Sequence, residues 1–250
     1  MIAATQPERT LAFVAGVLLL VTYLTSIPPF IYHYVPVVGD PGYIAGPGAD
    51  TRVTWGAFLE LLLIVSNIGS AVVLFPILKR VSEIAALGWV TARIVESAFI
   101  AVGILSMLTV VTLRQDAAVA GTDAASLLAI GQALVALHQW TFALGPGFVV
   151  GIGNGMLLGY LMYRSNLVPR RLAVLGLVGG PMLCAYGTGV MFGVFEAGSV
   201  WQVIGTLPEF VWEPSLGIWL IAKGLNPAAP AARPAKAGTP NLASAAAGAA

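Results

Sequence analysis

Charged residues are scarce in this sequence. Of its 250 residues, 12 are Lys or Arg and 11 are Asp or Glu, so charged side chains make up 9% of the chain. A formal net charge of +1 leaves no basic surface of the kind that binds nucleic acid. The mean hydropathy of +0.89 is far above that of a soluble globular protein. We therefore expect the partner of this chain to be a lipid bilayer, and we expect no nucleic acid.

Cysteine and histidine are nearly absent. The single cysteine, Cys184, lies inside an apolar run, which excludes a disulfide framework and a cysteine-based metal site. The two histidines, His33 and His138, are too few for a histidine-rich metal site. A carboxylate-rich site stays allowed by composition alone. We predict no bound metal and no cofactor.

Long apolar runs take up most of the chain. Stretches of about 18 or more apolar residues are typical of transmembrane helices. Six such runs occur, at about 10–31, 54–78, 84–113, 125–163, 172–195 and 199–223. They predict an all-α polytopic membrane protein, with six transmembrane helices in one bundle over residues 1–225. The remaining residues, 226–250, are rich in Ala and Pro, and we expect them to form a disordered tail.

The run at 125–163 allows two interpretations. As a single helix it would extend roughly 58 Å, nearly twice the thickness of the bilayer core. It either splits at residues 145–147 into two spans or forms one helix kinked near Pro146. With six spans, seven basic residues share one side of the membrane: Arg9, Lys79, Arg80, Arg164, Arg170, Arg171 and Lys223. The positive-inside rule then favours six spans with both termini cytoplasmic.

Five polar residues inside these runs share one depth. They are Asn67, Arg93, Glu96, Asn154 and Glu213, and they come from four of the predicted helices. Each lies roughly 15–24 Å from the basic flank of its helix, which is the middle of the bilayer. A charge there costs at least about 2.5–3.5 kcal/mol on insertion scales, so such groups face the bundle interior and pair. We predict that the five form one polar layer.

Glu60 and His138 form a second predicted layer, nearer the outer ends of their helices. Glu60 precedes Asn67 by seven residues and therefore lies on the same helix face. His138 has an alternative place beside Trp140 in an aromatic belt at the membrane surface.

The predicted interior has more negative than positive groups. Arg93 is its one cation, whereas Glu60, Glu96 and Glu213 are carboxylates. One carboxylate can pair with Arg93. The other two must then be protonated, hydrogen-bonded, solvated or neutralised by a bound cation. This imbalance is the strongest functional signal in the sequence.

Four stretches resemble the bacterial integral membrane proteins grouped as domain of unknown function 4386. They are LFPILKRVSEIAALGWVTARIVES (74–97), LHQWTFALGPGF (137–148), YRSNLVPRRLAVLGLVGG (163–180) and LPEFVWEPSLGIWLIAKG (207–224). The resemblance covers roughly residues 8–225. It implies a six-helix multi-pass protein of a bacterial inner (cytoplasmic) membrane, and it implies no activity. The motif positions that it carries over are Arg93, Glu96, Pro169, Arg170, Glu209 and Glu213.

Three functional hypotheses follow from these residues. The first is binding or transport of a small cation, proton or polar ligand at the mid-membrane layer. The second is an intramembrane enzyme that uses Glu60, Glu96 and His138 as acid–base groups or metal ligands. The third is a non-catalytic assembly or sensor protein whose charges only determine helix order. No internal repeat of the kind seen in many transporters is evident, and the sequence indicates no oligomeric state.

Overall fold

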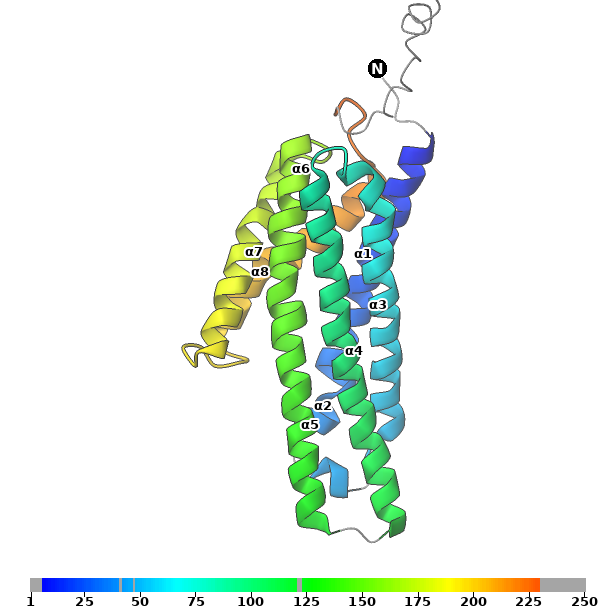
Figure 1. Ribbon diagram of the computed structural model, residues 1–250, viewed down its shortest axis with the longest axis vertical. Coiled ribbons are helices and arrows are strands. Elements are labelled where there is room, and N and C mark those ends of the chain that lie inside the picture. The colour runs from blue at the N-terminus through cyan, green and yellow to red at the C-terminus, as the bar shows by residue number, and fades with distance from the viewer. Residues whose placement is uncertain (1–5, 41, 47, 121–122, 230–250) are drawn as a thin grey trace, which may run out of the picture.

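Long helices packed side by side make up the structure (Figure 1). This computed structural model describes residues 6–40, 42–46, 48–120 and 123–229, and these residues contain no β-strand. Residues 230–250, which hold most of the predicted tail, lie outside the described residues. The elements are α1 (Gln6–Pro28), η1 (Pro29–His33), α2 (Val35–Val38), η2 (Tyr43–Ala45), α3 (Asp50–Leu78), α4 (Glu83–Ala120), α5 (Ala124–Leu144), η3 (Gly145–Val149), η4 (Gly151–Leu158), α6 (Gly159–Ser165), α7 (Arg170–Met191) and α8 (Val200–Ala222).

Five helical segments are long and apolar enough to cross a membrane. They are Glu8–Val38, Asp50–Leu78, Glu83–Asp116, Ala124–Ser165 and Arg170–Met191. The sixth long helix, α8, has 23 residues, among them two glutamates and two prolines, and it packs along α1 and α7. The prediction of an all-α, multi-pass membrane fold is confirmed.

The outer faces of the bundle are apolar. Large side chains such as Leu24, Val65 and Leu105 are more than 60% exposed although they lie in the middle of long helices. An exposed apolar surface of this extent is suited to contact with lipid chains and not with water. The bilayer is therefore the natural surrounding of these helices.

The segment with two interpretations is one continuous helix, Ala124–Ser165. It passes from α5 into the π-helical turns η3 and η4 and ends in α6. Pro146 has no N–H, and in a regular α-helix its ring would clash with the carbonyl four residues earlier. A π turn accommodates the proline: the Val150 N–H donates to the Gly145 carbonyl, five residues back.

Several helix ends differ from the predicted boundaries by a few residues, and two of these differences have a clear physical reason. Helix α4 continues beyond residue 113 to Ala120, and Arg114 lies within it with its charge paired. Its Nε donates to Oδ1 of Asp50 at 2.7 Å, and its Nη2 forms an ion pair with the same carboxylate. Helix α7 ends at Met191 and not at residue 195, because Gly193 has a φ of 70°, which a helix cannot continue through.

Helix α1 begins and helix α8 ends at the same end of the bundle (Figure 1). An ion pair of 3.0 Å between Glu8 and Arg80 joins the start of α1 to the end of α3. The backbone N–H of Asn226 donates to the Leu167 carbonyl at 2.8 Å, which attaches the segment after α8 to the α6–α7 turn. Ala229, within the segment expected to be a tail, is buried at this end.

At the opposite end, α4 ends and α5 begins (Figure 1). Asp123 caps α5, since its carboxylate accepts hydrogen bonds from the hydroxyl and the backbone N–H of Ser126. These hydrogen bonds hold the pKa of the Asp123 carboxyl below its ordinary value. The α7–α8 hairpin ends well short of the end where α4 meets α5 (Figure 1).

Polar residues interrupt the apolar packing in the first half of α4. Trp89 belongs to the largest buried apolar cluster, and Ile100 belongs to a separate one with Leu63. Between them on the same helix lie Arg93 and Glu96, both at most 4% exposed. The fold therefore encloses two charges between apolar layers.

Candidate functional site

Arg93 and Glu96 form the centre of the site. They lie three residues apart on α4 and therefore on one face of the helix. The Nη1 atom of Arg93 donates to Oε2 of Glu96 at 2.9 Å. Both side chains are buried, so this ion pair is not weakened by water.

Glu213 brings α8 to the same arginine. Its Oε1 atom accepts from Nη2 of Arg93 at 3.2 Å and from Nδ2 of Asn154 at 3.1 Å. The Glu213 side chain is 14% exposed, more than that of Glu96. One guanidinium therefore bridges carboxylates from α4 and α8.

Asn67 adds α3 to the network. Its Nδ2 donates to Oε1 of Glu96 at 3.0 Å, so both oxygens of Glu96 accept a hydrogen bond. The Oδ1 atom of Asn67 is buried and has no hydrogen-bond donor within the described residues. The structure thus brings together all five residues of the predicted mid-membrane layer.

Two tryptophans hold Asn154 in place. The indole N–H of Trp89 donates to Oδ1 of Asn154 at 3.0 Å, and that of Trp212 donates to its backbone carbonyl at 3.1 Å. Asn154 lies in the π-helical segment η4, and π turns occur often at functional sites. With its amide oxygen occupied, Asn154 can only donate to Glu213.

Glu209 is a further carboxylate of this site; it was expected only as a position of the family resemblance and not as a member of the polar layer. It lies four residues before Glu213 and therefore on the same face of α8. Its side chain is buried, and neither carboxylate oxygen has a hydrogen-bond partner in the part of the chain that the structure describes. It interacts electrostatically with Glu213, Arg93 and Glu96. The i, i+4 spacing of two glutamates was the signal that could have identified it.

Glycines surround the Glu209 carboxylate. A Cβ atom added to Gly155 would lie 2.9 Å from Oε2 of Glu209, and one added to Gly179 would lie 3.0 Å from it. A Cβ on Gly155 would also overlap the Cα of Gly180. These glycines allow α7 and η4 to approach closely, and they leave the carboxylate against backbone hydrogens with no polar donor.

Glu60 and His138 lie in a separate buried group. The hydroxyl of Tyr34 donates to Oε2 of Glu60 at 2.7 Å, and the Tyr34 ring contacts the His138 ring edge-on, with 5.0 Å between centroids. Nδ1 of His138 is buried without a partner among the described residues. Tyr34 comes from the segment after α1, where no periodic pattern indicated a buried residue.

The structure therefore changes which carboxylates surround Arg93, but not how many. The carboxylates near this arginine are Glu96, Glu209 and Glu213, whereas Glu60 interacts with Tyr34. The surplus of carboxylates over the one guanidinium is the same as expected, but one member differs. Within the described residues, no three side chains of His, Cys, Asp or Glu are placed to hold a metal ion.

Comparison with known proteins gives one match. The sequence matches the family described as Domain of unknown function (DUF4386) over residues 14–224. No curated protein and no solved structure matches the chain. The matched range begins in α1 and ends just after α8. It includes the Arg93 cluster, that is, Arg93, Glu96, Glu209 and Glu213. This chain, a multi-pass protein of apolar helices, belongs to the DUF4386 family.

Proposed function

We propose that this protein reversibly binds a proton at the cluster of Arg93, Glu96, Glu209 and Glu213. The observation that carries the proposal is the Glu209 carboxylate. It is 4% exposed, and its two oxygens have no hydrogen-bond donor among the described residues. An isolated carboxylate in such a place is neutralised instead of staying charged.

The ion pairs of Arg93 support a proton at Glu209. The guanidinium already contacts Glu96 and Glu213, so its charge is shared between two carboxylates. Glu209 interacts with both of these acids and with Arg93, so its own charge would add to an existing negative surplus. Compared with a bound cation, a proton removes that surplus with the least change in structure, because it needs no shell of oxygen ligands.

The proposal is tested by infrared difference spectroscopy on the protein reconstituted in lipid, recorded while pH is raised. We expect a protonated carboxyl band that disappears reversibly at high pH. The substitution Glu209→Gln should remove this band, because the amide cannot ionise. A matched control is Glu60→Gln, which alters an equally buried glutamate bonded to Tyr34 and should leave the Glu209 band unchanged.

The same spectra can contradict the proposal. A titrating band that persists in Glu209→Gln would assign the proton to another group. A spectrum without any pH-dependent carboxyl band would exclude reversible protonation of the cluster. Displacement of the band by Na⁺ at constant pH would instead identify a small cation as the ligand.

A second candidate function is a non-catalytic role in which the cluster determines helix order. The observation that favours it is the complete pairing of Glu96, which accepts hydrogen bonds from Arg93 and Asn67 in a buried setting. This role predicts that Glu96→Gln and Glu213→Gln lower stability and alter no proton signal. The enzyme hypothesis has less support, because Glu96 bonds to Arg93 and Asn67 whereas Glu60 bonds to Tyr34.

The proposed location is the inner membrane of a bacterium, with both termini in the cytoplasm. Support comes from the basic residues near the bundle end where α1 begins and α8 ends: Arg9, Lys79, Arg80, Arg164, Arg170, Arg171 and Lys223. The other end has Arg52 and Arg114, and Arg114 is paired with Asp50. An excess of Lys and Arg of this kind is typical of the cytoplasmic side.

A further inference from the structure

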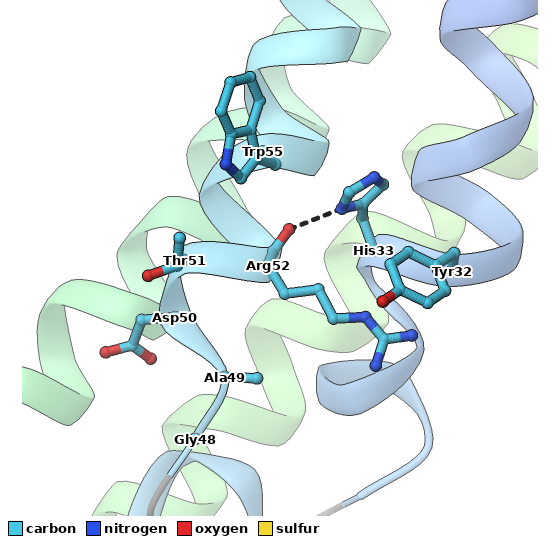
Figure 2. A pocket seen from close by; sticks show the side chains of 8 residues that line it. All are labelled: Tyr32, His33, Gly48, Ala49, Asp50, Thr51, Arg52 and Trp55. Atoms are coloured by element: carbon cyan, nitrogen blue, oxygen red, sulfur yellow. Dashed lines mark hydrogen bonds between the residues drawn. The ribbon is translucent and has the colours of Figure 1, made fainter.

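A pocket of about 630 Å³ lies between η1 and the first turns of α3, far from the Arg93 cluster. Its lining residues are Tyr32, His33, Gly48, Ala49, Asp50, Thr51, Arg52 and Trp55 (Figure 2). The chain changes here from polar residues to the long apolar run of α3, which begins at Val53. Such a border is expected at the surface of the bilayer, where aromatic residues gather.

Arg52 is the charged group of this pocket that has no counter-ion. Its guanidinium carbon lies 3.6 Å from the centre of the Tyr32 ring, and its Nε is buried without an acceptor. No carboxylate of the described residues lies within ion-pair distance of it, so its binding capacity is unused. A guanidinium stacked on a ring keeps its planar fork available for a phosphate or carboxylate group.

The acid of the pocket is already neutralised. Asp50 forms an ion pair with Arg114 and accepts hydrogen bonds from Tyr43 at 2.9 Å and from Gln115 at 2.9 Å. In Figure 2 its carboxylate lies on the far side of the α3 backbone from the Arg52 guanidinium. The pocket therefore presents one net positive charge to an incoming group.

His33 fixes the geometry of this site. Its Nδ1 lies 2.9 Å from the backbone carbonyl of Arg52 and donates to it, because the carbonyl can only accept (Figure 2). This bond connects η1 to the first turn of α3. The site is therefore built from two segments and does not rest on the start of a helix alone.

An apolar surface continues from the pocket along α3. Trp55, Phe58 and Leu62 follow one another at helical spacing on one face, and they are 56%, 47% and 39% exposed. Ile31 of η1, next to Tyr32, is 63% exposed. A ligand with a negative head and an apolar body would contact both the arginine and this surface.

We propose that the pocket binds the phosphate group of an anionic phospholipid. Arg52 would bind the phosphate, and the α3 surface would contact the acyl chains. Arginine forms two parallel hydrogen bonds with phosphate oxygens, and the aromatic ring beneath it holds the fork in place. This inference is independent of the proton site at Glu209.

Native mass spectrometry of the full chain, titrated with phosphatidylglycerol or phosphatidylcholine, tests the site. We expect one phosphatidylglycerol to be retained in preference to phosphatidylcholine, because both carry the phosphate but the choline cation is repelled by the positive charge of the pocket. Arg52→Gln should weaken this binding by roughly tenfold or more, as expected for loss of a charge-assisted hydrogen-bond pair. Arg52→Lys keeps the positive charge but cannot make the two parallel hydrogen bonds of a guanidinium, so it should weaken binding less than Arg52→Gln.

Arg170→Gln is the matched control, because Arg170 also lies over a ring, that of Tyr163, at 5.2 Å, and belongs to no part of this pocket. It should leave the retained lipid unchanged. Equal retention by the wild-type protein and a folded Arg52→Gln or Arg52→Lys variant would overturn the proposal. Displacement of the lipid by inorganic phosphate at equal concentration would also overturn it, since a free phosphate would then be the ligand.

Discussion

At the scale of single residues, Arg93 determines how the interior charges are arranged. It is 1% exposed and bridges Glu96 on its own helix to Glu213 on α8. Burying so many charges costs much desolvation free energy. Their pairing therefore mainly offsets this desolvation cost and adds little stability of its own. Removing one member of such a group therefore lowers the stability of the protein more than removing a complete pair does.

We predict that Arg93→Met lowers the free energy of unfolding by about 3–5 kcal/mol, because it leaves Glu96 and Glu213 without their cation. The double variant Arg93→Met/Glu96→Gln should recover part of that loss. Thermal and denaturant unfolding in detergent would give both values. Arg80→Gln is the control, since it removes the partially exposed ion pair with Glu8 and should cost about 1 kcal/mol or less. Additive losses in the double variant would contradict the prediction.

At the scale of secondary structure, glycines decide how closely α7 approaches η4. A Cβ on Gly151 would lie 2.7 Å from the Gly180 carbonyl oxygen, and one on Gly180 would lie 2.8 Å from the Met156 nitrogen. These contacts are with backbone, which cannot rotate away as a side chain can. The close approach also brings α7 against Glu209, so the packing of the glycines and the burial of the carboxylate depend on each other.

We predict that Gly180→Ala destabilises the protein by about 1–3 kcal/mol or more, because its methyl group would press into the backbone of η4. Gly88→Ala is the matched control. It is also a helical glycine, but its Cβ would meet a flexible side-chain atom, Cδ1 of Leu157, at 3.3 Å. This change should be neutral or stabilising, since alanine favours helix. Similar unfolding temperatures for the two variants would refute this account of the packing.

At the scale of the whole molecule, two ends of different composition define the bundle. The turn between α3 and α4, the α6–α7 turn and the segment after α8 lie at one end, joined by contacts such as Arg80–Glu8 and Asn226–Leu167. The end of α4, the start of α5 and the pocket at Arg52 lie away from that end. Because the end where α1 begins and α8 ends has more basic residues, the positive-inside rule predicts that this end faces the cytoplasm.

We predict that the end where α1 begins and α8 ends faces the cytoplasm. In a background in which Cys184 is replaced by alanine, Ala197→Cys in the α7–α8 hairpin and Ala125→Cys at the start of α5 should react with a membrane-impermeant thiol reagent on intact cells. Glu83→Cys, at the start of α4 and next to the α3–α4 turn, should react only after the cells are opened. All three positions are exposed on the protein. The reverse pattern would show the opposite orientation.

Much of this architecture follows from the sequence by itself. Apolar runs longer than the bilayer core can satisfy their backbone groups in lipid only as helices, so the all-α fold and the positions of the long helices were predictable. That Asn67, Arg93, Glu96, Asn154 and Glu213 lie at one level of the bundle was predictable by counting residues, because the helical rise per residue is constant.

The tertiary structure alone decided which side chains meet. Helical spacing places Glu209 and Glu213 on one face, but only the packing of α7 and η4 leaves Glu209 buried without a donor. Likewise, Glu60 lies outside the arginine cluster and accepts a hydrogen bond from Tyr34, which comes from a distant segment of the sequence. Depth along a helix is a local property that the sequence specifies. Rotation and separation of helices depend on contacts among all of them, and these determine where the surplus negative charge lies.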